Sequence, residues 1–145
     1  MRRLVLGLPL FLFIGVASTI AFVGISIAAL ISQPIFEPAF VVFCSVAFLV
    51  GLVAFCAGFV SAISASRYQE ISLFGVFFLA ENAAPKKIRN QYAAVVVAQT
   101  IVGVAVAAQG LFSPLAFAAL VPQLGFGLMA IHGGFLGEFP AKTST

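Results

Sequence analysis

Four long apolar segments, each free of Asp, Glu, Lys and Arg, most constrain what this chain can fold into. They run over about 4–31, 38–65, 92–111 and 114–136. About 20 apolar residues in a helix cross the roughly 30 Å hydrocarbon core of a bilayer. Because hydrocarbon offers no partner for backbone N–H and C=O groups, a spanning segment must pair them internally as a helix. We therefore expect an all-α membrane protein with four transmembrane helices.

The composition excludes a water-soluble or disordered chain. Hydrophobic residues make up 63% of the 145 residues and charged residues 8%, with a mean hydropathy of +1.22. Soluble domains carry about 45–50% apolar and about 25% charged residues. Seven Lys and Arg and four Glu cannot cover the surface of such a domain, and disorder requires the opposite composition. We interpret residues 1–145 as a single integral membrane domain.

The basic residues predict the orientation in the membrane. All seven lie before the first segment, between the second and third, or after the fourth: Arg2, Arg3, Arg67, Lys86, Lys87, Arg89 and Lys142. The connections at 32–37 and 109–113 contain no Lys or Arg. Cytoplasmic loops are enriched in basic residues. We therefore expect two transmembrane hairpins in the cell membrane, joined by a cytoplasmic loop, with both termini in the cytoplasm.

The N-terminal segment resembles a signal peptide at its start, with two Arg and then an apolar stretch. The apolar run continues to Ile31, which exceeds the 7–15 residues of a signal-peptide core. We interpret it as an uncleaved first helix.

The loop between the second and third segments contains ten further apolar residues, Ile71–Ala80. As a helix they would rise about 15 Å, half the bilayer core. A fifth span would also move the basic residues at 86–89 to the outer side. We predict a short interfacial or re-entrant element here, and simple packing beneath the loop is the alternative.

Small residues recur at steps of three and four along the second segment. The set is Cys44, Ala47, Gly51, Ala54, Gly58, Ser61 and Ala65. Shorter stripes occupy the first segment (Ala17, Ala21, Gly24, Ala28) and the fourth (Gly127, Ala130, Gly134, Gly137). Lipid gives helices no hydrophobic reason to associate, so they pair where small residues allow close packing. We favour an internal helix–helix seam over a homo-oligomer interface.

Few polar residues lie within the segments. The candidates for interhelical polar contacts are Gln99, Thr100, Gln123 and His132. We expect Gln99 and Gln123, at similar depths, to pair across the second hairpin. His132 lies near the cytoplasmic end of its helix, where we expect a hydrogen bond to a neighbour or to water; proton handling is the alternative. Gln123 and His132 are nine residues apart and point to opposite sides.

Pro122 interrupts the fourth segment. A proline within a helix removes one backbone hydrogen bond and kinks the helix. We expect a continuous helix over 114–136 that is kinked here, with a freed carbonyl near Ala118.

The residue inventory excludes several chemistries. There is no Asp, one His and two Cys, so paired-aspartate catalysis, a bis-His haem and a four-ligand zinc site all lack their ligands. Cys44 and Cys56 would lie about 18 Å apart on one helix and cannot form a disulfide. We predict no catalytic, cofactor-binding or metal-binding residues, no cofactor and no enzymatic activity.

Two stretches resemble small four-helix membrane proteins of actinobacteria. One is SLFGVFFLAENAAPKKIRNQ at 72–91; the other comprises LAF at 115–117, VP at 121–122, GFGL at 125–128 and the terminal Phe139-Pro140. Members of that group tend to carry an aromatic residue and Arg before the last Phe-Pro, where this chain has Gly133, Gly134 and Phe135. The resemblance covers about half of the chain, contains no catalytic motif and implies a location in the cell envelope.

Together these features favour a non-enzymatic accessory or assembly subunit of a larger cell-envelope complex. The alternative is a small transporter or channel for an uncharged solute, lined by Gln99, Thr100 and Gln123. The expected partners are the lipid bilayer, anionic lipid headgroups near Lys86, Lys87 and Arg89, and other membrane proteins or further copies of the chain. Nucleic acid is not among them.

Overall fold

A computed structural model describes residues 2–70, 73–79, 84–137 and 139. The described chain is all-helical. Its elements are α1 (Arg2–Ile31), α2 (Gln33–Ala65), α3 (Leu73–Phe78), α4 (Lys86–Gln109), the 3₁₀ helix η1 (Pro114–Leu120) and α5 (Pro122–Leu136). Four stretches are long and apolar enough to cross a membrane: Leu10–Ile31, Ile35–Ala65, Lys86–Gln109 and Pro114–Leu136. The expected all-α architecture with four membrane-length apolar helices is confirmed.

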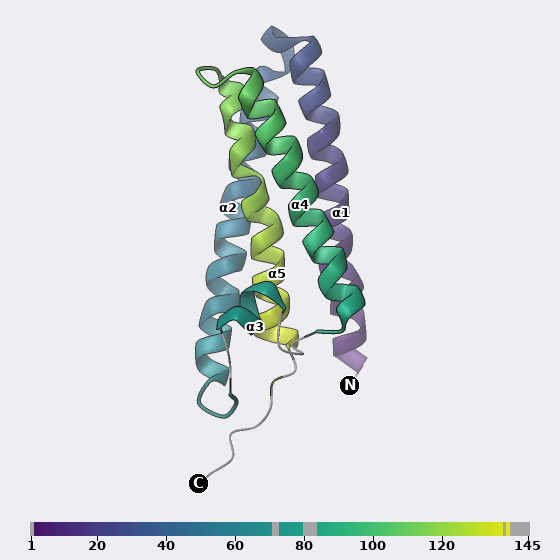
Figure 1. Ribbon diagram of the computed structural model, residues 1–145, viewed down its shortest axis with the longest axis vertical. Coiled ribbons are helices and arrows are strands. Elements are labelled where there is room, and N and C mark those ends of the chain that lie inside the picture. The colour runs from purple at the N-terminus through teal and green to yellow at the C-terminus, as the bar shows by residue number, and fades with distance from the viewer. Residues whose placement is uncertain (1, 71–72, 80–83, 138, 140–145) are drawn as a thin grey trace.

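The long helices lie side by side, and α3 lies at the end of the bundle where α1 begins and α5 ends (Figure 1). Helix α5 is the central element because it contacts α1, α2, α3 and α4, most extensively α2. Helix α1 lies at the periphery. Within the span Leu10–Ile31, 17% of the most apolar 18-residue stretch is buried. The corresponding share within Pro114–Leu136 is 50%.

Prolines shift the helix boundaries away from the expected ones. Helix α2 begins at Gln33, so the predicted loop over 32–37 is wrong and only Ser32 separates α1 from α2. Pro34 occupies one of the first two positions of α2, where the missing N–H would have no acceptor within the helix. Helix α4 begins directly after Pro85 rather than near 92, so the basic residues at 86–89 form its first turn.

The fourth segment is not the continuous kinked helix that the sequence predicts. It begins as η1 and becomes α-helical only at Pro122, the first residue of α5. The Ala118 carbonyl is not freed, because it accepts a 3₁₀-type bond of 3.3 Å from the Val121 N–H. This local geometry also brings η1 close to α4. A Cβ built on Gly103 would lie only 2.7 Å from the Ala118 oxygen.

The contact between α2 and α5 is made by facing glycines. A Cβ on Gly51 would strike the backbone of α5 at Gln123, and one on Gly127 would strike the Gly51 backbone. One heptad further on, Gly58 and Gly134 repeat this relation, so the two helices run in the same direction. The seven-residue spacing is typical of helices that cross at a small angle. Backbone therefore lies against backbone at two levels.

The small-residue stripe of α1 lies elsewhere. Ala17, Ala21 and Gly24 are exposed, and Ala28 is half-buried. A Cβ on Gly24 would meet nothing within 4 Å. The described bundle thus uses the stripes of α2 and α5 internally and leaves that of α1 outside.

The contrast between these glycines gives a matched test. Gly58→Ala should lower the stability of the detergent-solubilised protein by about 1–3 kcal/mol, because the new methyl group forces α2 from α5. Gly24→Ala makes the same chemical change in open space and should be neutral or stabilising by about 0.5–1 kcal/mol. Thermal unfolding followed by circular dichroism compares the two. Equal midpoints would contradict the backbone contact.

Candidate functional site in the buried polar groups

Three polar side chains are buried among the described residues: Ser26, Gln99 and His132. The Ser26 hydroxyl has no hydrogen-bond partner. Two apolar clusters occupy the rest of the interior. One surrounds Phe22 and Phe40, and the other surrounds Leu79, Tyr92 and Leu128. Any chemistry in the interior therefore depends on Gln99, His132 and the groups that they contact.

Gln99 of α4 joins three helices through its amide. Its Nε2 donates to Thr19 Oγ1 at 3.0 Å and to Ser18 Oγ at 3.4 Å, both on α1. Its Oε1 accepts the Gly125 N–H of α5 at 3.2 Å. Both α1 hydroxyls in turn donate to the Gly15 carbonyl. A Cβ on Gly125 would come within 2.8 Å of Oε1, so this glycine permits the approach.

The expected Gln99–Gln123 pair is wrong. The Val121 carbonyl at the start of α5 accepts from the Leu124 N–H at 2.9 Å, and the next N–H, that of Gly125, donates to Gln99 instead. Gln123 lies earlier in the first turn and is half-exposed. The Thr100 hydroxyl bonds to the Val96 carbonyl of its own helix at 2.8 Å. Among the described residues, the hydrogen bonds of Gln99 and Thr100 therefore do not join Gln99, Thr100 and Gln123 to one another.

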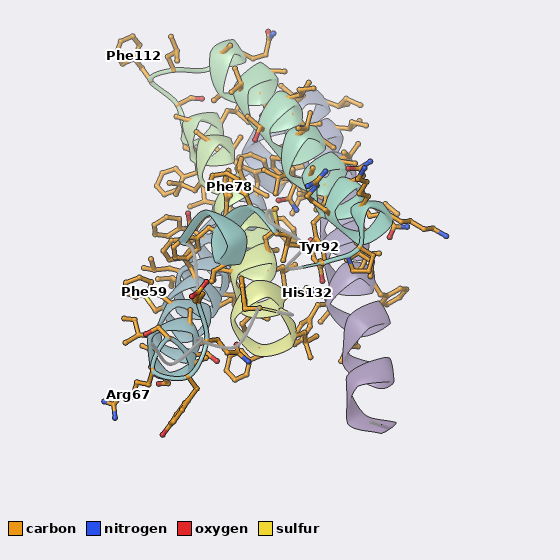
Figure 2. The ribbon with its side chains drawn as sticks, turned by 60° about the horizontal axis from the view of Figure 1, so that its bottom comes forward. Phe59, Arg67, Phe78, Tyr92, Phe112 and His132 are labelled. Carbon is orange, nitrogen blue, oxygen red and sulfur yellow. The ribbon has the colours of Figure 1, made fainter. Side chains whose placement is uncertain are left out.

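His132 is buried, with 1% of its surface exposed, and it faces Tyr92 of α4. The Tyr92 hydroxyl lies 3.4 Å from His132 Nδ1, and the ring centroids are 5.2 Å apart (Figure 2). Tyr92 is thus the hydrogen-bonding neighbour expected for His132, although the sequence indicates Tyr92 only as the start of the third apolar segment. The available signal was the position of both residues at the same end of the second predicted hairpin.

The two polar contacts between α4 and α5 are separated by the same number of residues on both helices. Tyr92 and Gln99 are seven residues apart on α4, and Gly125 and His132 are seven apart on α5. Seven residues correspond to about two turns, or about 10 Å. The α4–α5 interface is thus bonded at two levels, with apolar side chains such as Leu128 buried in the core cluster that includes Tyr92.

Helix α3 packs beside the Tyr92–His132 pair. A Cβ on Gly133 would strike the Val76 backbone of α3. The ring of Phe77 stacks on that of Phe55 of α2, with the ring centroids 4.5 Å apart. Leu79, which follows α3, is fully buried and has a φ of 50°, a conformation that is uncommon for residues with a side chain. The apolar segment predicted at 71–80 is therefore folded against the bundle over its described part, and residues 71, 72 and 80 lie outside the described residues.

The predicted small-residue stripe of α2 runs along its inner side. Cys44, Ala47, Gly51, Ala54 and Gly58 are buried, whereas Ser61 and Ala65 are half-buried. The Ser61 hydroxyl donates to the Gly134 carbonyl of α5 at 2.8 Å.

Within the described residues no three His, Cys, Asp or Glu side chains gather as metal ligands would. Cys44 is buried and Cys56 is exposed, and both are free thiols. Gln99 and the Tyr92–His132 pair can hold helices together through hydrogen bonds. Comparison with family models, with curated proteins and with solved structures gives no match to this chain.

The bonds of Gln99 predict a stability effect. Gln99→Leu keeps a similar side-chain size but leaves the Gly125 N–H without its acceptor and the Ser18 and Thr19 hydroxyl oxygens without their amide donor. We expect a loss of about 1–3 kcal/mol in the free energy of unfolding. Thr100→Val is the control on the next residue, because its hydroxyl bonds only within α4. Denaturant titration in mixed micelles measures both, and a Gln99→Leu protein as stable as Thr100→Val would refute the three-helix link.

Proposed function

We propose that the chain is a multi-pass protein of the cell membrane, with two transmembrane hairpins, cytoplasmic termini and α3 at the cytoplasmic interface. The support is the charge asymmetry of the bundle. Helix α2, which Arg67 follows by two residues, ends at the end of the bundle where α1 begins, and the basic first turn of α4 lies there too (Figure 1). At the opposite end the α4–η1 turn carries the exposed Leu111 and Phe112 and has no basic residue. Anionic lipid headgroups are the expected partners of the basic end.

Single cysteines at the two ends test this orientation. In a Cys56→Ala background, Phe112→Cys should react with a membrane-impermeant maleimide in intact cells, because Phe112 is exposed at the outer tip (Figure 2). Arg67→Cys should react only after the membrane is opened. Labelling of both from the same side would overturn the topology.

Within that membrane we propose that the protein is a non-enzymatic accessory or assembly subunit of a larger cell-envelope complex. The observation that carries this proposal is the outer face of α1. Large and small side chains alternate along it at steps of four and three from Phe13 through Ala17, Ile20 and Gly24 to Ile27, and the large Ile31 follows four residues later. We call this set the α1 seam. Its large members are among the most exposed side chains of the helix, from 52% at Ile27 to 77% at Ile31.

This alternation matches what a partner helix requires. A repeat of four and three residues lets side chains of one helix enter the spaces of another. In lipid, small residues at the contact are what allow the backbones to approach. Lipid chains alone need no such spacing, and Gly24 costs helix stability relative to alanine without any internal contact to compensate. The proposed occupant is a transmembrane helix of another envelope protein. The resemblance to small actinobacterial membrane proteins supports the envelope location.

The interior supports a non-enzymatic role. The polar atoms of Gln99 and the His132–Tyr92 pair are engaged in bonds that join α4 to α1 and α5. Groups used in this way hold the fold together.

Filling the seam tests the partner. Gly24→Leu adds bulk where the bundle itself has open space, so the protein should fold normally yet recover about tenfold less of the co-purifying partner after mild detergent extraction. Val53→Leu on the exposed side of α2 is the control and should recover partner as the wild type does. Quantitative mass spectrometry of the eluates measures the ratio.

Three results would contradict the proposal. One is a wild-type eluate with no stoichiometric partner, and another is equal recovery by both variants. The third is an eluate that contains only further copies of this chain, which would make the α1 seam a homo-oligomer interface.

A further inference from the structure

A groove runs along the outside of the bundle between α1 and α4. Its volume is about 330 Å³. It is lined by Leu12, Val16, Thr19 and Ile20 from α1 and by Gln91, Ala94, Val95 and Ala98 from α4. Ala94 and Ala98 contribute only methyl groups to its α4 wall. All of its walls are apolar except for Gln91 at one end and Thr19 at the other.

A single lysine stands in line with this groove. Lys87, Gln91, Ala94 and Ala98 are separated by four, three and four residues, so they share one face of α4. Lys87 and Gln91 are both exposed. Lys86 and Arg89 lie on other faces of the helix. The N-terminal end of α4 adds partial positive charge at the same level. The groove is therefore cationic and polar at its mouth and apolar along its length.

The length of this face matches one leaflet of a bilayer. From Lys87 to Ala98 the helix rises about 16 Å, and half of the roughly 30 Å hydrocarbon core is about 15 Å.

The polar side chain at the deep end of the groove needs no hydrogen bond from an occupant. The Thr19 hydroxyl donates to the Gly15 carbonyl at 2.8 Å and accepts from Gln99 Nε2 at 3.0 Å.

We propose that this groove is a binding site for one anionic phospholipid of the cytoplasmic leaflet. One acyl chain lies between α1 and α4 against Ala94 and Ala98. The phosphate lies beside Lys87, and the Gln91 amide donates to the glycerol or ester oxygens. This inference rests on the membrane orientation proposed above, because that orientation places Lys87 at the cytoplasmic headgroup level.

Native mass spectrometry of the detergent-solubilised protein tests the site with two added lipids. The wild type should retain phosphatidylglycerol about fivefold better than phosphatidylcholine of the same chains, as one lysine near a lipid surface provides. Lys87→Gln should abolish this preference. Lys86→Gln removes an equal charge from another face of the helix and should leave most of it.

A second pair of variants separates the acyl-chain groove from the headgroup. Ala94→Leu fills the groove without changing any charge and should reduce retention of both lipids. Val97→Leu adds bulk on an exposed part of α4 outside the groove and should not. Because Ala94 is exposed, its substitution leaves the core intact, and unchanged thermal unfolding checks this.

Two outcomes would overturn the proposal. Equal effects of Lys86→Gln and Lys87→Gln would indicate unspecific attraction to the basic end. Loss of retention in Lys87→Gln but not in Ala94→Leu would indicate headgroup contact without a chain in the groove. The partner assay on the α1 seam is a separate readout, so lipid retention without any co-purifying protein would reject the accessory role and keep the lipid site.

Discussion

The rest of the structure depends on the contact of backbone with backbone between α2 and α5. In a bilayer, helices gain nothing from hiding apolar side chains from lipid, so their association relies on close packing. Gly51 and Gly58 on α2 meet Gly127 and Gly134 on α5 without any intervening side chain. This places α5 at the centre of the bundle, where α1, α3 and α4 pack around its remaining sides.

Because α2 occupies one side of α5 so closely, the polar contacts of α5 lie on its other side. There α4 is joined to α5 through the Gln99 amide and, two turns away, through Tyr92 and His132. Gly125 allows α4 to approach α5 closely, as the glycines facing α2 allow α2 to do, because a side chain at either place would prevent the contact. Close packing and polar bonding thus work on opposite faces of a single helix and fix its rotation.

The sequence predicted the features that depend on composition and period. Length and hydropathy indicated the four long helices, and the small-residue spacing on α2 singled out residues that the structure places along its inner side. The partners of polar side chains could not be predicted, because depth in a segment does not determine the rotation of the helix. Gln99 accepts a hydrogen bond from the backbone N–H of Gly125 and does not pair with the Gln123 side chain. The start of α2 was missed because Pro34 was interpreted as part of a loop, although proline suits a first helical turn.

The peripheral position of α1 connects the two proposed surfaces. Of the two α1 glycines whose surroundings are described, Gly15 is in ordinary van der Waals contact with Val95 and Leu128 and Gly24 meets nothing within 4 Å, so neither makes a backbone contact like those between α2 and α5. The hold of α1 on the bundle therefore relies on side-chain packing and on the Gln99 bonds to Ser18 and Thr19. A helix held in this way leaves a groove beside α4 and a free outer face. Ile20 lines that groove and also belongs to the α1 seam. Under the two proposals, a partner helix on the seam would therefore pack partly against the lipid chain in the groove.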